Sequence, residues 1–441
     1  MRRQLAVLAG AALICAAAAA PASAQVIPTR PFPGLFGSGD PAKSVTQVDF
    51  VSFLAGGRDV ATTSLDDGAL GTSRSETGFG NLVLRGRLAH QGRRTRFGSY
   101  ASGTTSYYSR AGGERTPFSF SGGATFSGSV GRYGSFALRQ TVFYSPYYVV
   151  GAVSTETADG PEAETEVSPD ADSSVDPRVD QRVTRLSTTG YASAASIGRR
   201  VGRDGSLFTS YRLHYVDYAE RAPDLLAHAP RGGYRHRFSR YASFVASYGL
   251  TAYEYRHSGY GRLASHNIGL GLGYNRPLSA WRHTTVGFNV GTALIDDGRF
   301  TRAYLTGNGR IYRRFARTWI GGLTYLRAQQ VLEGFVAPFF TFSDTIAGSF
   351  SGDLGRGVAL SGRLAYSHSR FTFDELENTF DTLAATTRLR VPVVSMLSAY
   401  VEAYYAEHDF QRRLGLLQGI PASLERFGTR AGVTLSVPVY R

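Results

Sequence analysis

The sequence predicts an all-β fold, a transmembrane antiparallel up-and-down β-barrel of about eighteen strands. Two observations predict this class. From about residue 45, segments of about ten residues alternate between apolar and polar side chains, and each segment ends in turn-forming residues. The connections between segments alternate between short and long, as in barrels with turns on one side of a membrane and loops on the other. Sixteen strands are the alternative count, because the stretches 221–240 and 331–350 are ambiguous.

Residues 1–24 have the features of a cleaved secretory signal peptide. Arg2 and Arg3 supply positive charge, and Leu5 to Ala20 form a short apolar run. Ala22-Ser23-Ala24 then offers the small residues that a signal peptidase requires. The apolar run is too short for a membrane-spanning helix, so we expect an exported protein.

The residues after this segment contain no cysteine, because the only one is Cys15. The mature chain is therefore expected to lack disulfides and thiol-based sites. Residues 25–44 carry several prolines and are expected to form an extended periplasmic lead-in, followed by the barrel over 45–441.

Residues 81–90 illustrate the alternation. Leu82, Leu84 and Leu88 fall on one face, whereas Arg85 and Arg87 fall on the other. A strand of a soluble sandwich alternates in the same way, so the evidence for a membrane barrel comes from the repetition of the pattern along the chain. The pattern recurs at 118–130, 267–274, 286–291, 358–367 and 427–437. In a barrel the apolar face meets lipid and the polar face meets a lumen.

The predicted connections differ in length and chemistry. The short ones are rich in arginine and glycine and cover 91–95, 131–134, 198–205, 239–240, 313–317 and 355–357. The long ones cover 56–78, 151–181, 221–233 and 410–424. Aromatic residues border both kinds, as expected for girdles at the two membrane interfaces.

The segment 151–182 is dense in aspartate and glutamate and almost free of large apolar residues. It cannot form a core and is predicted to be a disordered external loop. Asp170, Asp172 and Asp176 lack the glycine and terminal glutamate of a calcium loop, so no metal ligand is predicted.

The formal net charge is +14 at pH 7. Such a balance raises the question of nucleic-acid binding. The arginines are spread along the chain rather than gathered in one patch, and the predicted signal peptide directs the chain out of the cytoplasm. No nucleic-acid partner is therefore expected.

Several arginines share the polar parity of their predicted strands. They are Arg85, Arg87, Arg185, Arg212, Arg310, Arg363, Arg388, Arg390 and Arg430. If that parity is the lumen, the pore wall is basic and concentrates anions. The alternative is that these arginines pair with carboxylates on neighbouring strands and stiffen the wall. Parity predicts which way a side chain faces but not what it pairs with, so both interpretations stay open.

No catalytic residue or cofactor is predicted. The nearest candidate is His214, with Ser210 and Asp217 close by in the sequence. A lone histidine in a barrel wall is more often a hydrogen-bonded lining residue than a general base. Glycines follow the strand periodicity, and none forms a phosphate-binding loop between a strand and a helix.

Over residues 45–441 the chain resembles porin-like outer-membrane β-barrel proteins, a loose group. The resemblance rests on the alternation and on tight basic turns such as Arg237-Phe238-Ser239-Arg240-Tyr241. It implies a bacterial outer-membrane location, insertion by the barrel-assembly machinery and contact with lipid and lipopolysaccharide. The chain departs from the usual pattern because Arg441 follows Tyr440 and Pro438 interrupts the last strand. Its charge and strand number also resemble the alginate-export type of barrel.

These features together predict a passive channel for small polar or anionic solutes, since sixteen to eighteen strands leave a water-filled lumen. Two alternatives stay open. One is an export conduit for an anionic exopolysaccharide, and the other is a non-conducting barrel that anchors its loops at the cell surface.

Overall fold

A computed structural model describes most of the chain from Val45 onwards. The described residues are 45–64, 73–109, 118–146, 187–218, 224–256, 263–278, 281–296, 301–332, 339–373, 376–410 and 423–440. The predicted signal peptide 1–24, the lead-in 25–44 and the acidic segment 151–182 lie outside them. Within the described ranges, no helix is long and apolar enough to cross a membrane.

The described residues form the strands β1 (Val45–Ser64), β2 (Ser73–Gln91), β3 (Thr95–Tyr108), β4 (Phe118–Val130), β5 (Gly134–Ser145), β6 (Thr188–Val201), β7 (Gly205–Tyr218), β8 (Asp224–Arg237), β9 (Ala242–Arg256), β10 (Leu263–Leu278), β11 (Trp281–Asp296), β12 (Thr301–Arg314), β13 (Ile320–Leu332), β14 (Phe339–Gly355), β15 (Val358–Phe373), β16 (Leu376–Val394), β17 (Leu397–Phe410) and β18 (Ser423–Tyr440).

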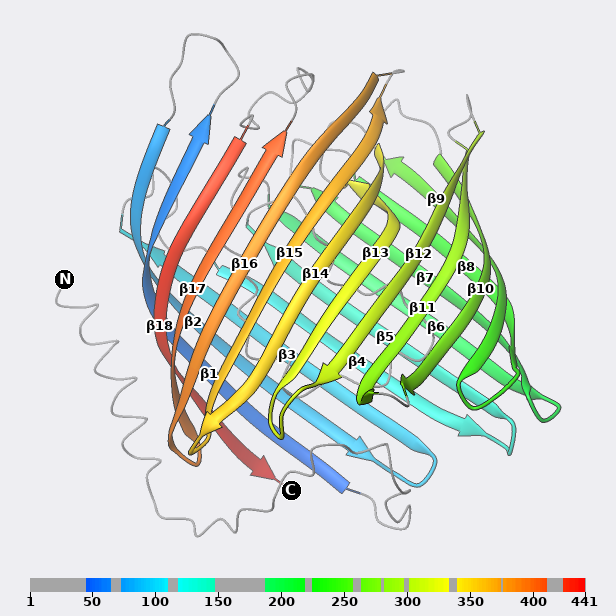
Figure 1. The fold of residues 1–441 in the computed structure, drawn as a ribbon, viewed down its shortest axis with the longest axis horizontal. Helices are drawn as coiled ribbons and strands as arrows, with labels where there is room; N and C mark the ends of the chain where they lie inside the picture. The colour runs from blue at the N-terminus through cyan, green and yellow to red at the C-terminus, as the bar shows by residue number, and fades with distance from the viewer. Residues whose placement is uncertain are drawn as a thin grey trace. The chain divides into compact units, whose positions relative to one another are not determined.

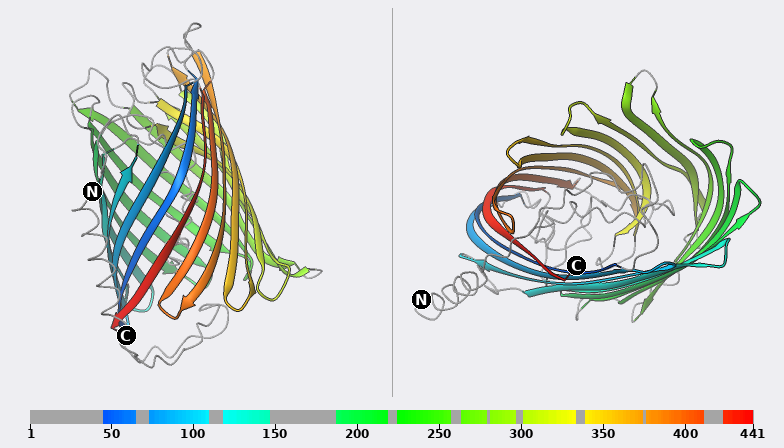
Figure 2. Two further views of the ribbon diagram at one scale, coloured as in Figure 1. Left: turned by 90° about the vertical axis from the view of Figure 1, so that its left-hand side faces the viewer. Right: turned by 90° about the horizontal axis from the view of Figure 1, so that it is seen from below.

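All these strands belong to one closed antiparallel sheet of 18 strands. Each strand pairs with its neighbours in sequence, and β1 pairs with both β2 and β18, which closes the barrel. Figure 1 shows β14–β17 crossing in front of the strands of the opposite wall, and Figure 2 shows the blue β1 beside the red β18. The predicted up-and-down barrel and its strand number are confirmed, and the count of sixteen is wrong.

The alternation of the sequence places large apolar residues on the outside of the barrel. In β2, Leu82 and Leu84 are exposed, whereas Asn81 and Val83, which alternate with them, are buried. The same holds in β4, where Phe118, Phe120 and Phe126 are exposed. Because cross-strand partners point to the same face, the registers carry this assignment around the whole sheet. Lipid is the solvent that tolerates such an apolar surface, so the outer face is the membrane face.

Most connections agree with the predictions. Short turns join β2 to β3, β4 to β5, β6 to β7 and β8 to β9 at the predicted positions, and the first and last strands begin and end on the same side as these turns. That end is the periplasmic end of the barrel. Two predicted long connections are wrong. Residues 224–233 belong to β8, and the predicted loop 56–78 shrinks because β1 extends to Ser64 and β2 begins at Ser73.

The second correction has a physical cause. Gly56, Gly57, Gly78 and Gly80 suggest a loop, but they lie in regular β1–β2 pairs, where Gly56 faces Gly80. A Cβ atom at Gly57 would collide with the ring of Phe79 and the backbone of β18. These glycines therefore make room for a neighbour in the sheet rather than ending a strand.

Aromatic rings cover glycines at several other positions of the wall. Phe143 of β5 lies over Gly190 of β6, its cross-strand partner. On the outer face, Trp319 lies over Gly352 and Phe350 lies over Gly362. A ring that covers a strand glycine shields its backbone and supplies the packing that the glycine lacks.

We predict that Gly190→Val destabilises the barrel by about 1–3 kcal/mol, because the new side chain must displace the ring of Phe143. Thermal unfolding of the detergent-solubilised barrel measures this change. The matched control is Gly348→Val, since a Cβ atom at Gly348 meets nothing within 4 Å. Equal unfolding temperatures for the two variants would contradict the packing role of Phe143.

Candidate functional site

The inner wall of the barrel is the candidate functional site, because it is the polar face that the closed sheet turns away from lipid. All the predicted arginines that the structure describes lie on this face. Arg85 and Arg87 alternate with the exposed leucines of β2. The others lie on the inner parity of β7, β12, β15, β16 and β18 and are Arg212, Arg310, Arg363, Arg388, Arg390 and Arg430. Arg185 lies outside the described residues.

Two of these arginines share one carboxylate. Arg388, Glu402 and Arg430 are successive cross-strand partners on β16, β17 and β18. The Nε of Arg388 donates to a carboxylate oxygen of Glu402 at 2.6 Å, and an Nη of Arg430 donates to the other oxygen. The side chains of Glu402 and Arg430 are only 4 % and 1 % exposed. In ion pairs this deeply buried, loss of one partner leaves the other charge uncompensated in the wall.

Tyrosines complete this buried network. The guanidinium of Arg388 lies 4.8 Å from the ring centre of Tyr400, and that of Arg430 lies 5.9 Å from the ring centre of Tyr404. Both rings also cover strand glycines of β18, Gly432 and Gly428. The network therefore ties the last three strands together next to the seam where β18 meets β1. For Arg388 and Arg430, the structure thus agrees with the alternative in which inner arginines pair with carboxylates on neighbouring strands.

Other inner arginines are exposed. Arg212, Arg310 and Arg363 keep accessible side chains near the middle and periplasmic part of the wall. The structure adds Arg139 and Arg231, which lie on the inner parity of β5 and β8 and are also exposed. Sequence reasoning missed Arg231 because residues 221–233 read as a loop. Arg139 follows the inner-facing Ala137, and this alternation within β5 is the signal that could have found it.

Arginines of β5, β7 and β8 lie close together on this wall. Arg139 and Arg212 flank Ala194, which pairs with both. Arg231 pairs with Ser210, one inner position from Arg212. Strands lie about 4.8 Å apart, so Arg139 and Arg212 are separated by about 10 Å at the backbone. That separation is slightly more than the Debye length of about 8 Å in physiological salt, so salt screens the two charges from each other only in part.

Carboxylates are scarce on the inner face. Among the described residues of β3–β13, no aspartate or glutamate has the inner parity. Asp217, Asp224 and Glu254 of these strands all have the outer parity. Carboxylates with the inner parity lie elsewhere and include Asp49 on β1, Asp353 on β14 and Glu402 on β17.

Burial divides the inner wall into two zones. Toward the extracellular end the described inner residues are buried, including Ser106, Val216, Leu225, Ser343, Ser367, Thr382 and His408. Toward the middle and the periplasmic end, Ser349 and the arginines of β5, β7, β8, β12 and β15 are exposed, whereas Ser398, Tyr400 and the network of Arg388, Glu402 and Arg430 on β16–β18 are buried. The accessible part of the lumen wall is therefore the part that carries the exposed arginines.

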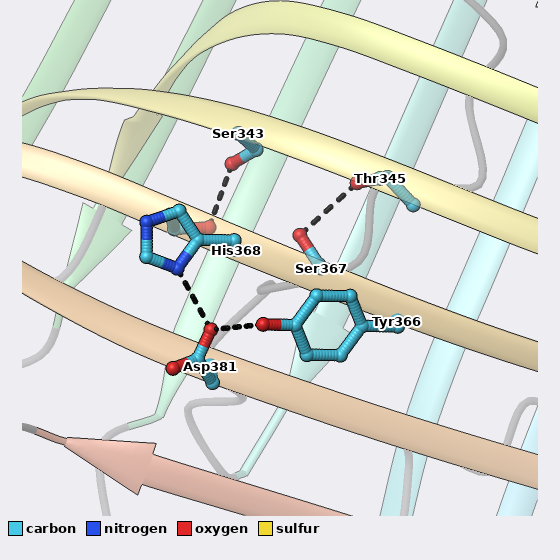
Figure 3. A network of polar contacts seen from close by, with 7 residues as sticks. Ser343, Thr345, Tyr366, Ser367, His368 and Asp381 are labelled. Carbon is cyan, nitrogen blue, oxygen red and sulfur yellow. Dashed lines mark hydrogen bonds and ion pairs between the residues drawn. The ribbon is translucent and has the colours of Figure 1, made fainter.

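Hydroxyl groups satisfy one another in the buried zone. Ser343 bonds to Ser369 at 2.8 Å, and Thr345 donates to Ser367 at 3.0 Å, both between β14 and β15 (Figure 3). Buried hydroxyls cost free energy unless they are paired, and these side chains are short enough to pair across one strand spacing.

The outer face carries a row of ionisable residues at one level near the extracellular end. Arg327, Asp344, His368, Asp381 and Asp409 are successive cross-strand partners from β13 to β17, and we call them the outer polar row. The hydroxyls of two tyrosines donate to this row, Tyr325 to Asp344 at 2.6 Å and Tyr366 to Asp381 at 2.7 Å. Figure 3 shows His368 and Tyr366 converging on Asp381.

The outer polar row marks where the apolar band ends. On β15 about ten residues separate Val358 from His368. At about 3.4 Å per residue and a tilt of about 40°, they span about 25 Å, the height of the apolar band of outer-membrane barrels. The row therefore lies at the level of the outer-leaflet headgroups.

The candidate enzymatic arrangement does not form. His214 and Ser210 have the inner parity of β7, whereas Asp217 has the outer parity. The described residues hold no group of three or more His, Cys, Asp or Glu arranged for a metal ion. Asp170, Asp172 and Asp176 lie outside the described residues.

No protein-family model matches the chain, and no curated protein matches it significantly. Among solved structures, Pseudomonas aeruginosa OpdQ is 11 % identical, with 90 % of this chain and 98 % of that chain covered and a TM-score of 0.44. OpdK of the same organism, in a structure with vanillate, is 11 % identical, with 88 % and 99 % covered and a TM-score of 0.45. Acinetobacter baumannii OccAB4 is 10 % identical, with 88 % and 98 % covered and a TM-score of 0.42. Similarity this low assigns no role to any residue of this chain.

We predict that Glu402→Gln strongly destabilises the barrel, by about 3–5 kcal/mol, because it leaves two buried guanidinium groups without their counter-charge. Thermal unfolding in detergent checks the prediction. The control is Glu407→Gln on the outer face of the same strand, where we expect a change of about 1 kcal/mol or less. A Glu402→Gln barrel as stable as the control would show that the network does not hold the seam.

Proposed function

We propose that the chain is a porin-like passive channel of the bacterial outer membrane that passes small polar solutes and prefers anions. The observation that carries this proposal is the inner wall of β3–β13. Its described residues present exposed arginines, including Arg139, Arg212, Arg231 and Arg310, and the strands supply no carboxylate on that face.

The physical argument is electrostatic. A sheet of 18 strands encloses more space than its own side chains fill, so water and small solutes enter. Fixed guanidinium charge beside a low-dielectric wall raises the local concentration of anions and lowers that of cations. The arginines of β5, β7 and β8 concentrate this charge on one side of the lumen.

We infer further that the chain is not an enzyme, because the inner wall brings together no nucleophile, base and orienting carboxylate among the described residues. Its partners then follow from its location. The apolar band meets lipid, the outer polar row meets the headgroups of lipopolysaccharide, and insertion depends on the barrel-assembly machinery. No feature of the described residues favours an exopolysaccharide conduit over the small-solute channel.

The triple variant Arg139→Ser, Arg212→Ser, Arg231→Ser tests the channel. In a planar bilayer with a KCl gradient, we expect the wild-type barrel to give an anion-selective reversal potential. The variant should lose most of that selectivity, because it removes charge from the accessible wall.

The matched control removes the same charge from the outer parity, with Arg199→Ser, Arg313→Ser and Arg370→Ser. It should keep the wild-type reversal potential. Absence of conductance would leave only the anchoring function, and cation selectivity of the wild type would contradict the basic lumen.

A further inference from the structure

Exposed arginines gather at one rim of the barrel. The short turns between β2 and β9, with the strand ends that flank them, carry Arg93, Arg94, Arg96, Arg132, Arg199, Arg200, Arg203, Arg237 and Arg240, all exposed. The only described carboxylate in these turns is that of Asp204. We call this set the basic turn row. It lies at the periplasmic end, because the start of β1 and the end of β18 lie on the same side as the short turns.

Two of these turns have the same design. Val130 to Gly134 reads Val-Gly-Arg-Tyr-Gly, and Val201 to Gly205 reads Val-Gly-Arg-Asp-Gly. Gly131 and Gly202 have φ angles of 63° and 71°, a left-handed conformation that glycine adopts without strain. A Cβ atom at the closing Gly134 or Gly205 would lie 2.6 Å from the carbonyl oxygen of the first valine. The backbone conformation therefore requires glycine at both of these positions in each turn, and it places Arg132 and Arg203 at equivalent positions.

Backbone hydrogen bonds also join each turn to the strands beside it. The amide of Ser129 donates to the carbonyl of Arg94 at 2.9 Å. The amide of Arg200 donates to Tyr133 at 2.8 Å, and that of Arg237 donates to Asp204 at 2.7 Å. Neighbouring turns are thus held two strand spacings apart, about 10 Å, which is about one Debye length.

The row continues into the lumen. Arg96, Arg200 and Arg237 have the inner parity, so they lie between the turn tips and the exposed arginines of the inner wall.

The opposite end of the barrel has a different charge composition. Its outer face carries Glu76, Asp217, Asp224, Glu254, Asp344, Asp381, Glu407, Asp409 and Glu425. Arg58, Arg256, Arg327 and Arg370 lie on the same outer face, and the acidic residues outnumber them. The described barrel therefore has a basic periplasmic mouth and a net acidic extracellular rim.

We propose that the basic turn row is a binding surface for multivalent anions at the periplasmic mouth. A monovalent anion meets the field of one or two arginines, whereas an anion with several charges neutralises several fixed guanidinium groups and releases their counterions. Binding to this surface does not require the proposed channel function. Its consequence for transport does rest on that function, and it is that anions are captured more readily from the periplasmic side. Lipid headgroups are the weaker candidate, because Arg96, Arg200 and Arg237 of the row face the lumen rather than the membrane.

Isothermal titration calorimetry in an uncharged detergent tests the surface, with inorganic tripolyphosphate and citrate as separate probes. The variant carries Arg94→Ser, Arg132→Ser, Arg203→Ser and Arg240→Ser, whose side chains make none of the backbone bonds above. We expect binding to weaken at least tenfold and to depend less steeply on salt concentration. Binding of both probes indicates a charge-selective surface, and binding of tripolyphosphate alone indicates a phosphate-selective one.

The matched control removes four arginines from the extracellular end, with Arg58→Ser, Arg256→Ser, Arg327→Ser and Arg370→Ser. It should bind the probes like the wild type. Equal losses of binding in the two variants, or no loss in the turn variant, would overturn the proposal. It would also be overturned if phosphatidylglycerol micelles bound to the row and displaced neither probe, because the probes would then bind elsewhere.

Calorimetry does not depend on conduction, so the two proposals fail separately. A barrel that binds tripolyphosphate but carries no current contradicts the channel and leaves the surface. An anion-selective barrel whose turn variant binds tripolyphosphate as tightly as the wild type contradicts the surface and leaves the channel.

Discussion

Every backbone amide and carbonyl at the level of the membrane core must find a partner within the sheet, because lipid offers none. Closure of β1 on β18 satisfies this constraint for the first and last strands, which would otherwise present two open edges. Closure in turn fixes the parity of every strand, because all cross-strand pairs point to the same face. The division of the chain into a lipid face and a lumen face therefore depends on the continuity of one hydrogen-bond ladder.

Charge placement follows from that division. A charged group on the inner face either meets water or needs a partner in the wall, and both solutions occur. Glu402 bridges Arg388 and Arg430 where the wall is buried, next to the closing seam. Arg139, Arg212 and Arg231 lie on the exposed part of the wall, where Arg231 also donates to the hydroxyl of Ser247 at 3.2 Å. The same residue type thus serves structure on β16–β18 and, in the proposed channel, lines the solute path on β5–β8.

The sequence predicted the barrel class, the strand number and most turns because strands of a membrane barrel follow a period of two, and few other folds repeat it eighteen times. It misplaced residues 224–233 because Pro230 and two following glycines favour a turn when only local propensity is considered. In the sheet, Pro230 has the outer parity and pairs with Tyr211, and β8 runs through it. Neighbouring strands here override local preference.

The site was predictable in part for a related reason. Alternation predicts which arginines face inward, and every described one does. Pairing and burial depend on register between strands, so nothing local distinguishes Arg388, which meets Glu402, from Arg363, which stays exposed. Arg139 and Arg231 were not among the predicted inner arginines. The arginine-rich turns of the basic turn row were recognised in the sequence, but their arrangement side by side at one rim was not predicted.

Cysteine accessibility tests the central claim, that parity separates a basic aqueous wall from lipid. Ser210 has the inner parity and pairs with Arg231, whereas the adjacent Tyr211 has the outer parity. In barrels carrying Ser210→Cys or Tyr211→Cys, the rate of modification by water-soluble thiol reagents of opposite charge is the measurement. The account predicts fast reaction at position 210, faster with the anionic than with the cationic reagent, and slow reaction at position 211. Equal rates at the two positions, or a preference of position 210 for the cationic reagent, would contradict it.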